Sequence, residues 1–165
     1  MSARPHLVAL PGYAGLELDI HFCSHCGAHA GEDGTTPISR VCGRCGLGLL
    51  IAASPTVAPD RGQPFLLVDG SLTTSGVSRE AERLLGVGEA DALHQRITDL
   101  LLPADCEAAG ADSLIHMLVS AARGDAPSAE LVVRPTREFG IRYWARIGSC
   151  GPPKGALIVL HDGLR

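Results

Sequence analysis

Four of the six cysteines form two short pairs whose spacing is typical of a metal site. Two residues separate Cys23 from Cys26, and Cys42 and Cys45 repeat this arrangement after a gap of fifteen residues. The pattern C-x2-C-x15-C-x2-C is that of four-thiolate sites, in which the turn inside each pair directs both sulfurs to one ion. A glycine follows each pair and allows the tight backbone that such a turn requires. We therefore predict that these four cysteines bind one metal ion.

Zinc is the expected ion, and its role is expected to be structural, because four thiolates complete a tetrahedral shell and leave no place for water or substrate. Iron fits the same shell, and spacing alone does not separate the two metals. A disulfide framework would suit a secreted protein, but residues 1–15 show no export signal, so we expect a reducing cytoplasm. A redox-active C-x-x-C pair would stand alone at the start of a helix, and neither pair of this chain does so. His21, His25 and His29 lie near the first pair and are expected at the surface or around the ligands.

Composition and charge limit the classes of partner. The 165 residues are 45% hydrophobic and 19% charged, as in a globular protein, and no apolar run is long enough to cross a membrane. The formal net charge is -4, and residues 1–63 carry four arginines against five acidic residues. Nucleic acid is therefore an unfavourable partner, because binding to phosphates requires a basic surface.

The chain is expected to divide at a linker, residues 54–63. Three prolines occur between Ser54 and Pro64, without periodicity. The linker separates residues 1–53, which hold the cysteines, from residues 64–165. We expect two cores that melt separately.

Residues 16–53 resemble the zinc-ribbon family in both cysteine pairs. An alternating strand that includes Ile20 and Phe22 enters the first pair, and an apolar strand over 47–53 leaves the second. Such a ribbon has little core of its own, so metal binding would supply most of its folding free energy.

The second part has a clear order of predicted elements. Two strands at 65–69 and 72–75 form a hairpin, and a helix follows between Ser78 as N-cap and Gly86 as C-terminal stop. The remaining predictions are a short helix at 98–102, an amphipathic helix at 112–123, and strands at 129–134, 141–148 and 156–162.

Three segments of this part resemble the Per-Arnt-Sim (PAS) family. They are FLLVDGSLTTSGVSREAERLLG from Phe65, LLLPAD from Leu100 and GALIVLHD from Gly155, and the order of elements matches as well. The resemblance implies an α+β fold, with a five-stranded antiparallel sheet and helices packed on one face. It also implies a sensor or dimerisation module that binds small molecules in the cleft between helices and sheet, or partners on its surface.

The residues argue against the known PAS cofactors and leave the cleft ligand unknown. His116 lies on the polar face of its predicted helix, which argues against haem ligation. Cys106 and Cys150 lack the sequence of a flavin-reactive cysteine and are expected to be small buried residues or ordinary thiols. The sequence contains no recognisable catalytic arrangement, so we predict that the protein is not an enzyme.

One face of the predicted strand 141–148 is suited to an interface. Arg142, Trp144 and Arg146 alternate onto that face, and tryptophan and arginine are enriched at the centres of protein interfaces. The last strand is apolar on both sides, so both faces of the sheet should be covered. A homodimer would bury Trp144, and packing of the ribbon over it is the alternative.

The sequence thus favours a cytoplasmic, non-enzymatic signalling or regulatory protein, with a structural Zn²⁺ ribbon, that acts through a homodimer and an unidentified signalling partner. The alternative is a transcription-associated adaptor whose ribbon contacts nucleic acid or the transcription machinery through Arg40 and Arg44. An enzyme that uses the PAS-like cleft would need clustered titratable groups lining it.

Overall fold

The computed structural model describes residues 18–31, 40–104, 110–125 and 127–162. Residues 1–15 and Cys106, on which the sequence analysis made predictions, lie outside these ranges. Within them the strands are β1 (Ile20–Cys23), β2 (Leu50–Ala53), β3 (Phe65–Val68), β4 (Thr74–Val77), β5 (Leu101–Pro103), β6 (Ala129–Pro135), β7 (Tyr143–Gly151) and β8 (Gly155–Asp162). The helices are α1 (Arg79–Leu85), α2 (Glu89–Ala92), α3 (Ile97–Leu100) and α4 (Gly110–Arg123).

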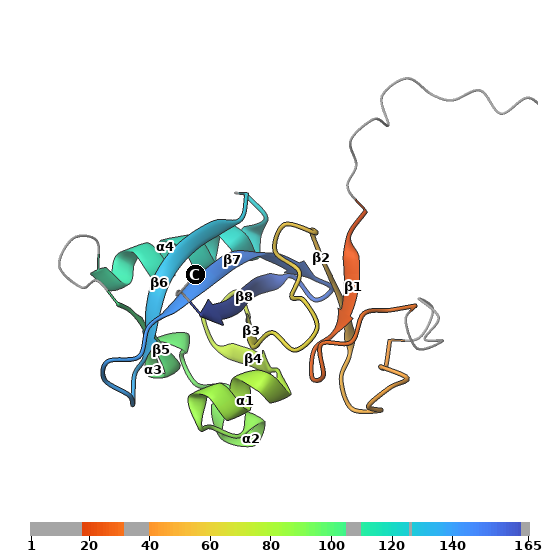
Figure 1. Cartoon of the computed structure of the whole chain (residues 1–165). Helices are drawn as coiled ribbons and strands as arrows, with labels where there is room; N and C mark the ends of the chain where they lie inside the picture. Colours follow the sequence, from red (N-terminus) through yellow and green to blue (C-terminus); the bar gives the residue numbers. More distant parts are fainter. Residues whose placement is uncertain (1–17, 32–39, 105–109, 126, 163–165) are drawn as a thin grey trace, which may run out of the picture.

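All eight of these strands belong to one antiparallel sheet (Figure 1). Its order is β1-β2-β7-β8-β3-β4, with β6 beside β7 and β5 beside β6. The five strands predicted from residues 64–165 are present as β3, β4, β6, β7 and β8. The prediction of a five-stranded sheet is nevertheless corrected, because β1, β2 and β5 also hydrogen-bond into it.

Local side-chain chemistry sets the boundaries of the first elements. The Asp69 carboxylate accepts hydrogen bonds from the backbone N–H groups of Ser71 (2.8 Å) and Thr73 (3.1 Å), so the turn extends to residue 73 and β4 begins two residues later than predicted. Ser78 caps α1 by accepting from the Ala81 N–H, and Gly86 ends it with φ of 61°. Both ends of α1 are thus as the sequence predicts.

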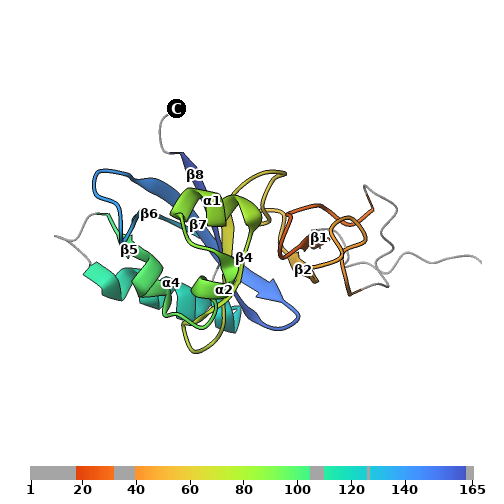
Figure 2. The same ribbon diagram turned by 90° about the horizontal axis from the view of Figure 1, so that it is seen from below.

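The helices pack on one face of the sheet, as the resemblance implies. Side chains from all four helices share a core with inward-facing residues of the strands, among them Leu66, Ala145, Ile158, Ala81, Ile97, Leu114 and Leu118. Along this face α4 contacts β7 and β8 (Figures 1 and 2).

A second core covers part of the opposite face. Phe22 and Ile51 from the β1–β2 hairpin pack there with Phe65, Leu157 and Val159 of the sheet. The rings of Phe22 and Phe65 meet edge to face, with centroids 5.3 Å apart. The expectation that the two parts have separate cores therefore does not hold, because this cluster takes residues from both.

Backbone pairing joins the hairpin to the same sheet. Ala52 pairs with Gly151 and Ala53 with Cys150, so β2 continues along the edge of β7 that β6 occupies at residues 143–147. The hairpin lies at one end of the sheet, beyond α1 and α2 (Figure 2). A strand of nine residues is long enough to serve both neighbours.

The proline-rich stretch at residues 54–63, predicted as a linker, contributes to the second core. Val57 and Ala58 are 1% and 5% exposed. A Cβ placed on Gly148 would lie 2.9 Å from a methyl of Val57, so the bare backbone of β7 provides the space that Val57 fills. The domain boundaries remain a prediction, but part of this stretch is packed.

The helices that the structure describes are all too short or too polar to cross a lipid bilayer.

Candidate functional site

The four cysteines of the predicted metal site converge at the end of the β1–β2 hairpin. Cys23 is the last residue of β1, and Cys42 and Cys45 precede β2. Their sulfur atoms all lie within 4.8 Å of one another. The Sγ atoms of Cys23 and Cys45 are 3.6 Å apart, and those of Cys26 and Cys42 are 3.8 Å apart.

These distances fit a single ion held by four thiolates. Sulfurs placed tetrahedrally at about 2.3 Å from zinc lie roughly 3.8 Å from each other. A disulfide would bring two sulfurs to about 2.0 Å. The cluster thus has the donor set and the spacing of a four-thiolate metal site.

Each cysteine pair forms the same turn. The N–H of Gly27 donates to the Cys23 carbonyl (3.0 Å), and the N–H of Gly46 donates to the Cys42 carbonyl (2.9 Å). Both glycines have φ of 68°, in the left-handed region that the sequence analysis anticipated for the residue after each pair. Backbone N–H groups of His25 and Cys26 point at the Cys23 sulfur at 3.4 Å. Such donors stabilise a thiolate.

Protonation of the cysteine cluster competes with metal binding. Burial raises the pKa of the Cys23 and Cys26 thiols, so without metal both hold their protons at pH 7. Burial also opposes ionisation of Cys45, but N–H groups of Gly48 and Leu47 and the neighbouring thiols lower its pKa to about 6. A metal ion must displace the protons of Cys23 and Cys26, and its affinity therefore falls as the pH falls.

Gly48 is a residue of the site that the sequence analysis missed. Its N–H donates to the Cys45 sulfur at 3.5 Å. A Cβ there would lie 2.8 Å from the His25 nitrogen and closer still to the Cys23 sulfur. The sequence shows only a second glycine two residues after Gly46. Its role follows from the close approach of the two cysteine turns, which the sequence does not reveal.

Two of the nearby histidines, His25 and His29, approach groups outside the sulfur cluster. His25 Nδ1 lies 3.5 Å from a Glu89 carboxylate oxygen of α2, and His29 Nε2 lies 2.8 Å from the Pro59 carbonyl oxygen. In addition the His25 carbonyl accepts from the Arg79 N–H at the start of α1. The first cysteine turn is thereby attached to the helical layer.

Two of the predicted interface residues, Trp144 and Arg146, lie on the face of the sheet opposite the helices, and Arg142 immediately precedes β7. We call Arg142, Trp144 and Arg146 the Trp144 surface. Trp144 is 37% exposed, and Arg142 is exposed as well. Arg146 is half-buried and donates through Nη2 to the Ala58 carbonyl (3.2 Å). The second core thus reaches Arg146 but leaves Trp144 accessible.

Two further apolar side chains are exposed close to Trp144 in the chain. Phe139 is 89% exposed and Ile141 is 37% exposed. The Arg134 guanidinium lies 5.6 Å from the centre of the Phe139 ring, a cation–π contact. The segment entering β7 therefore presents aromatic and basic groups together.

Other residues considered as sites are placed as follows. His116 is exposed on α4, as the helical pattern predicts. Cys150 is buried in the second core, and burial raises the pKa of its thiol to about 12, which makes it an unreactive apolar residue. Arg40 and Arg44 are both exposed beside the cysteine turn.

Comparison with known family models and with curated proteins gave no match. Among solved structures, the PAS domain of a protein from Colwellia psychrerythraea is 16% identical, with a TM-score of 0.43, over 61% of this chain and 86% of that domain. The Escherichia coli DhaR(N)–DhaL complex gives 16% identity and a TM-score of 0.42 over 62% of this chain, and this chain spans about a third (32%) of the matched one. Both similarities are low.

Proposed function

We propose that this chain is a non-enzymatic signalling or regulatory protein of the cytoplasm, in which a structural Zn²⁺ site fixes one end of a PAS-like sheet and the Trp144 surface contacts another protein. The observation that carries the proposal is the exposure of Trp144 on a sheet face whose other half is covered by the second core.

The metal part of the proposal rests on the thiolate shell. Four cysteine sulfurs within 4.8 Å fill a tetrahedral site, so a metal there has no free position for substrate. Its effect would be to hold the two cysteine turns together and so position Phe22 and β2 against the sheet. Thiolates survive as ligands where thiols stay reduced, which supports the cytoplasm.

The protein-contact part rests on the chemistry of the Trp144 surface. A half-exposed tryptophan between arginines is typical of the residues that dominate binding energy in interfaces. A second copy of the chain is the default partner, because two-fold dimers are the commonest assemblies of soluble proteins.

Native mass spectrometry of the full chain tests these assignments together. We expect one zinc per chain and a dimer that dissociates on dilution. The Cys42→Ser, Cys45→Ser double variant should lose the metal, because two thiolates do not form a closed shell. Stoichiometric iron, or full metal content in the double variant, would contradict the zinc assignment. A strictly monomeric parent would contradict the dimer.

A further inference from the structure

A cleft separate from the metal centre lies between α1 and the ends of β7 and β8. Its volume is about 380 Å³, which is in the range of small-molecule sites. The residues before β3 close one side, and α4 contributes nothing to its lining. The cleft is therefore distinct from the packed interior between α4 and the sheet.

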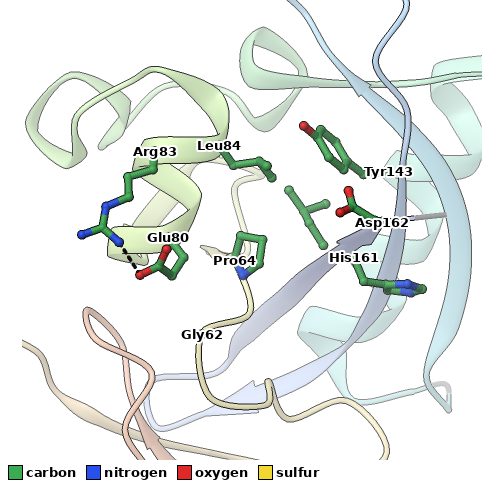
Figure 3. A pocket seen from close by; sticks show the side chains of 9 residues that line it. Gly62, Pro64, Glu80, Arg83, Leu84, Tyr143, His161 and Asp162 are labelled. Atoms are coloured by element: carbon green, nitrogen blue, oxygen red, sulfur yellow. Dashed lines mark hydrogen bonds and ion pairs between the residues drawn. The ribbon is translucent and has the colours of Figure 1, made fainter. Parts of the chain in front are cut away.

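The floor of this cleft is apolar. Leu160 of β8, Leu84 of α1 and Pro64 line it, and Leu160 is fully buried. In Figure 3 the Leu84 side chain points from α1 toward Tyr143, with Pro64 between the helix and the strands. An organic group of modest size would find hydrophobic contacts there.

The charged groups of the cleft carry a net negative charge, with Glu80 and Asp162 against Arg83. Tyr143 and Asp162 project from β7 and β8 toward α1, whereas His161 points the other way (Figure 3). At the outer rim the Arg83 guanidinium is paired with Glu80 at 2.6 Å. The Arg83 guanidinium is thus already paired, and the Asp162 carboxylate, exposed at the end of β8, is the remaining charge of the lining.

The Tyr143 hydroxyl lacks a hydrogen-bond partner among the described residues, although only 7% of the residue is exposed. Burial, together with the negative charges of Asp162 and Glu138, raises the pKa of this hydroxyl. Two carboxylates therefore act on one buried ring, and the hydroxyl oxygen is available to accept. The ring is buried, but the hydroxyl oxygen is not one of the buried atoms that lack a partner, so it opens into the cleft and is accessible to a ligand there.

From this geometry we infer that the cleft binds a primary ammonium group carried on a small apolar body. The ammonium would donate to the Tyr143 hydroxyl oxygen and to the Asp162 carboxylate, and would lie against the Tyr143 ring in a cation–π contact. The apolar body would rest on Leu84 and Leu160. An anion would meet Asp162 and be repelled. The free amine of a metabolite and the lysine side chain of a partner protein share this chemistry.

This inference is independent of the proposed signalling function, because binding requires neither a partner nor the metal. The test is NMR titration of the full, zinc-loaded chain with benzylammonium, benzyl alcohol and benzoate, which share a ring and differ in charge. Benzylammonium should bind in the millimolar range, as expected of a fragment, and shift the signals of residues lining the cleft. Benzyl alcohol should bind several-fold more weakly, and benzoate should not bind.

Two variants and one control sharpen the test. Asp162→Asn and Tyr143→Phe should each weaken benzylammonium binding about threefold or more. Glu130→Gln removes the same charge from β6, at a position that pairs with Arg146 outside the cleft, and should leave binding unchanged. Equal binding of benzyl alcohol, or an Asp162→Asn variant indistinguishable from Glu130→Gln, would overturn the inference.

A final arm separates the two sources of the ammonium. N-acetyl-lysine methylamide is titrated beside benzylammonium, and tighter binding of the lysine derivative assigns the cleft to a partner's lysine. Tighter binding of benzylammonium assigns it to a free amine. Failure of both to bind would overturn the inference.

Discussion

Gly48 lies where the two cysteine turns meet, and its lack of a side chain allows them to approach each other. It donates its N–H to the Cys45 sulfur and occupies a place where a Cβ would collide with the first cysteine turn. A methyl group at this position would therefore displace Cys23 or Cys45, because the close-packed backbone around it leaves little room to relax.

We predict that Gly48→Ala lowers zinc affinity by roughly tenfold or more, the effect typical of disturbing groups around metal ligands. Competition with a chromophoric chelator measures the change. Gly70→Ala is the matched control, because no atom lies within 4 Å of a Cβ at that position. Equal zinc affinity in the two variants would show that the two cysteine turns can move apart without loss of the metal.

Among the elements, the stretch at residues 54–63 changes most between expectation and structure. Its prolines suggest a spacer, but it carries Val57 into the hollow above Gly148 and offers the Ala58 carbonyl to Arg146. Proline limits the conformations of the unfolded chain and is compatible with a fixed path over a sheet. The stretch therefore acts as a packed connection between β2 and β3.

Val57→Ala should destabilise the whole chain by about 2 kcal/mol, because two methyl groups leave a fully buried site and Gly148 cannot fill the space. Urea unfolding measures the loss. Leu18→Ala is the control, since Leu18 is 85% exposed and its larger truncation should change stability by less than about 0.5 kcal/mol. A Val57→Ala variant as stable as the parent would mean that residues 54–63 do not pack on β7.

At the scale of the whole molecule, the two faces of one sheet carry different neighbours. The helices cover one face, while the β1–β2 hairpin and residues 57–58 cover part of the other. Because β2 also pairs with β7, the cysteine cluster at the end of the β1–β2 hairpin is joined directly to the sheet. Loss of a bound metal should then lower the stability of parts of the sheet that are distant from the cysteines.

We predict that chelation lowers the thermal midpoint reported by Trp144, the single tryptophan of the chain. Burial of Phe22 alone is worth about 2 kcal/mol, which corresponds to roughly 4 to 8 °C in a chain of this size. Fluorescence during heating, with and without chelator, measures the shift. The Cys42→Ser, Cys45→Ser variant should show no further shift on chelation. An unchanged Trp144 transition would instead support two independently melting parts.

The Trp144 surface yields a prediction about assembly. Trp144→Ala should weaken self-association by about 2 kcal/mol or more if Trp144 anchors the interface. Sedimentation across a concentration series measures the change. Leu47→Ala, at a 72% exposed position of the cysteine hairpin, should associate as the parent does. Association that survives Trp144→Ala undiminished would place the interface elsewhere.

What the sequence by itself determined is local. The turn within each cysteine pair, the left-handed glycine after it, and the Ser78 and Gly86 caps follow from residues within a few positions of each other. Short-range geometry limits such features to few arrangements, so residue type and spacing suffice. Most of the order of strands and helices in residues 64–162 was predictable for the same reason, since hydrophobic periodicity is itself local. The short elements α2 and β5 were missed, and part of the helix predicted at 98–102 is β5.

What only the tertiary structure decided joins residues far apart in the chain. The cysteine-bearing hairpin is part of the sheet because Phe22 contacts Phe65 and β2 pairs with β7. Val57 packs on Gly148 in the same region. The cleft at Tyr143 likewise needs α1 and the end of β8 in place. Apolar residues in the sequence show that a surface will be buried. They do not show which segment will cover it, because hydrophobic burial is non-directional. Partner and register are chosen by shape and backbone pairing, which exist only in the folded chain.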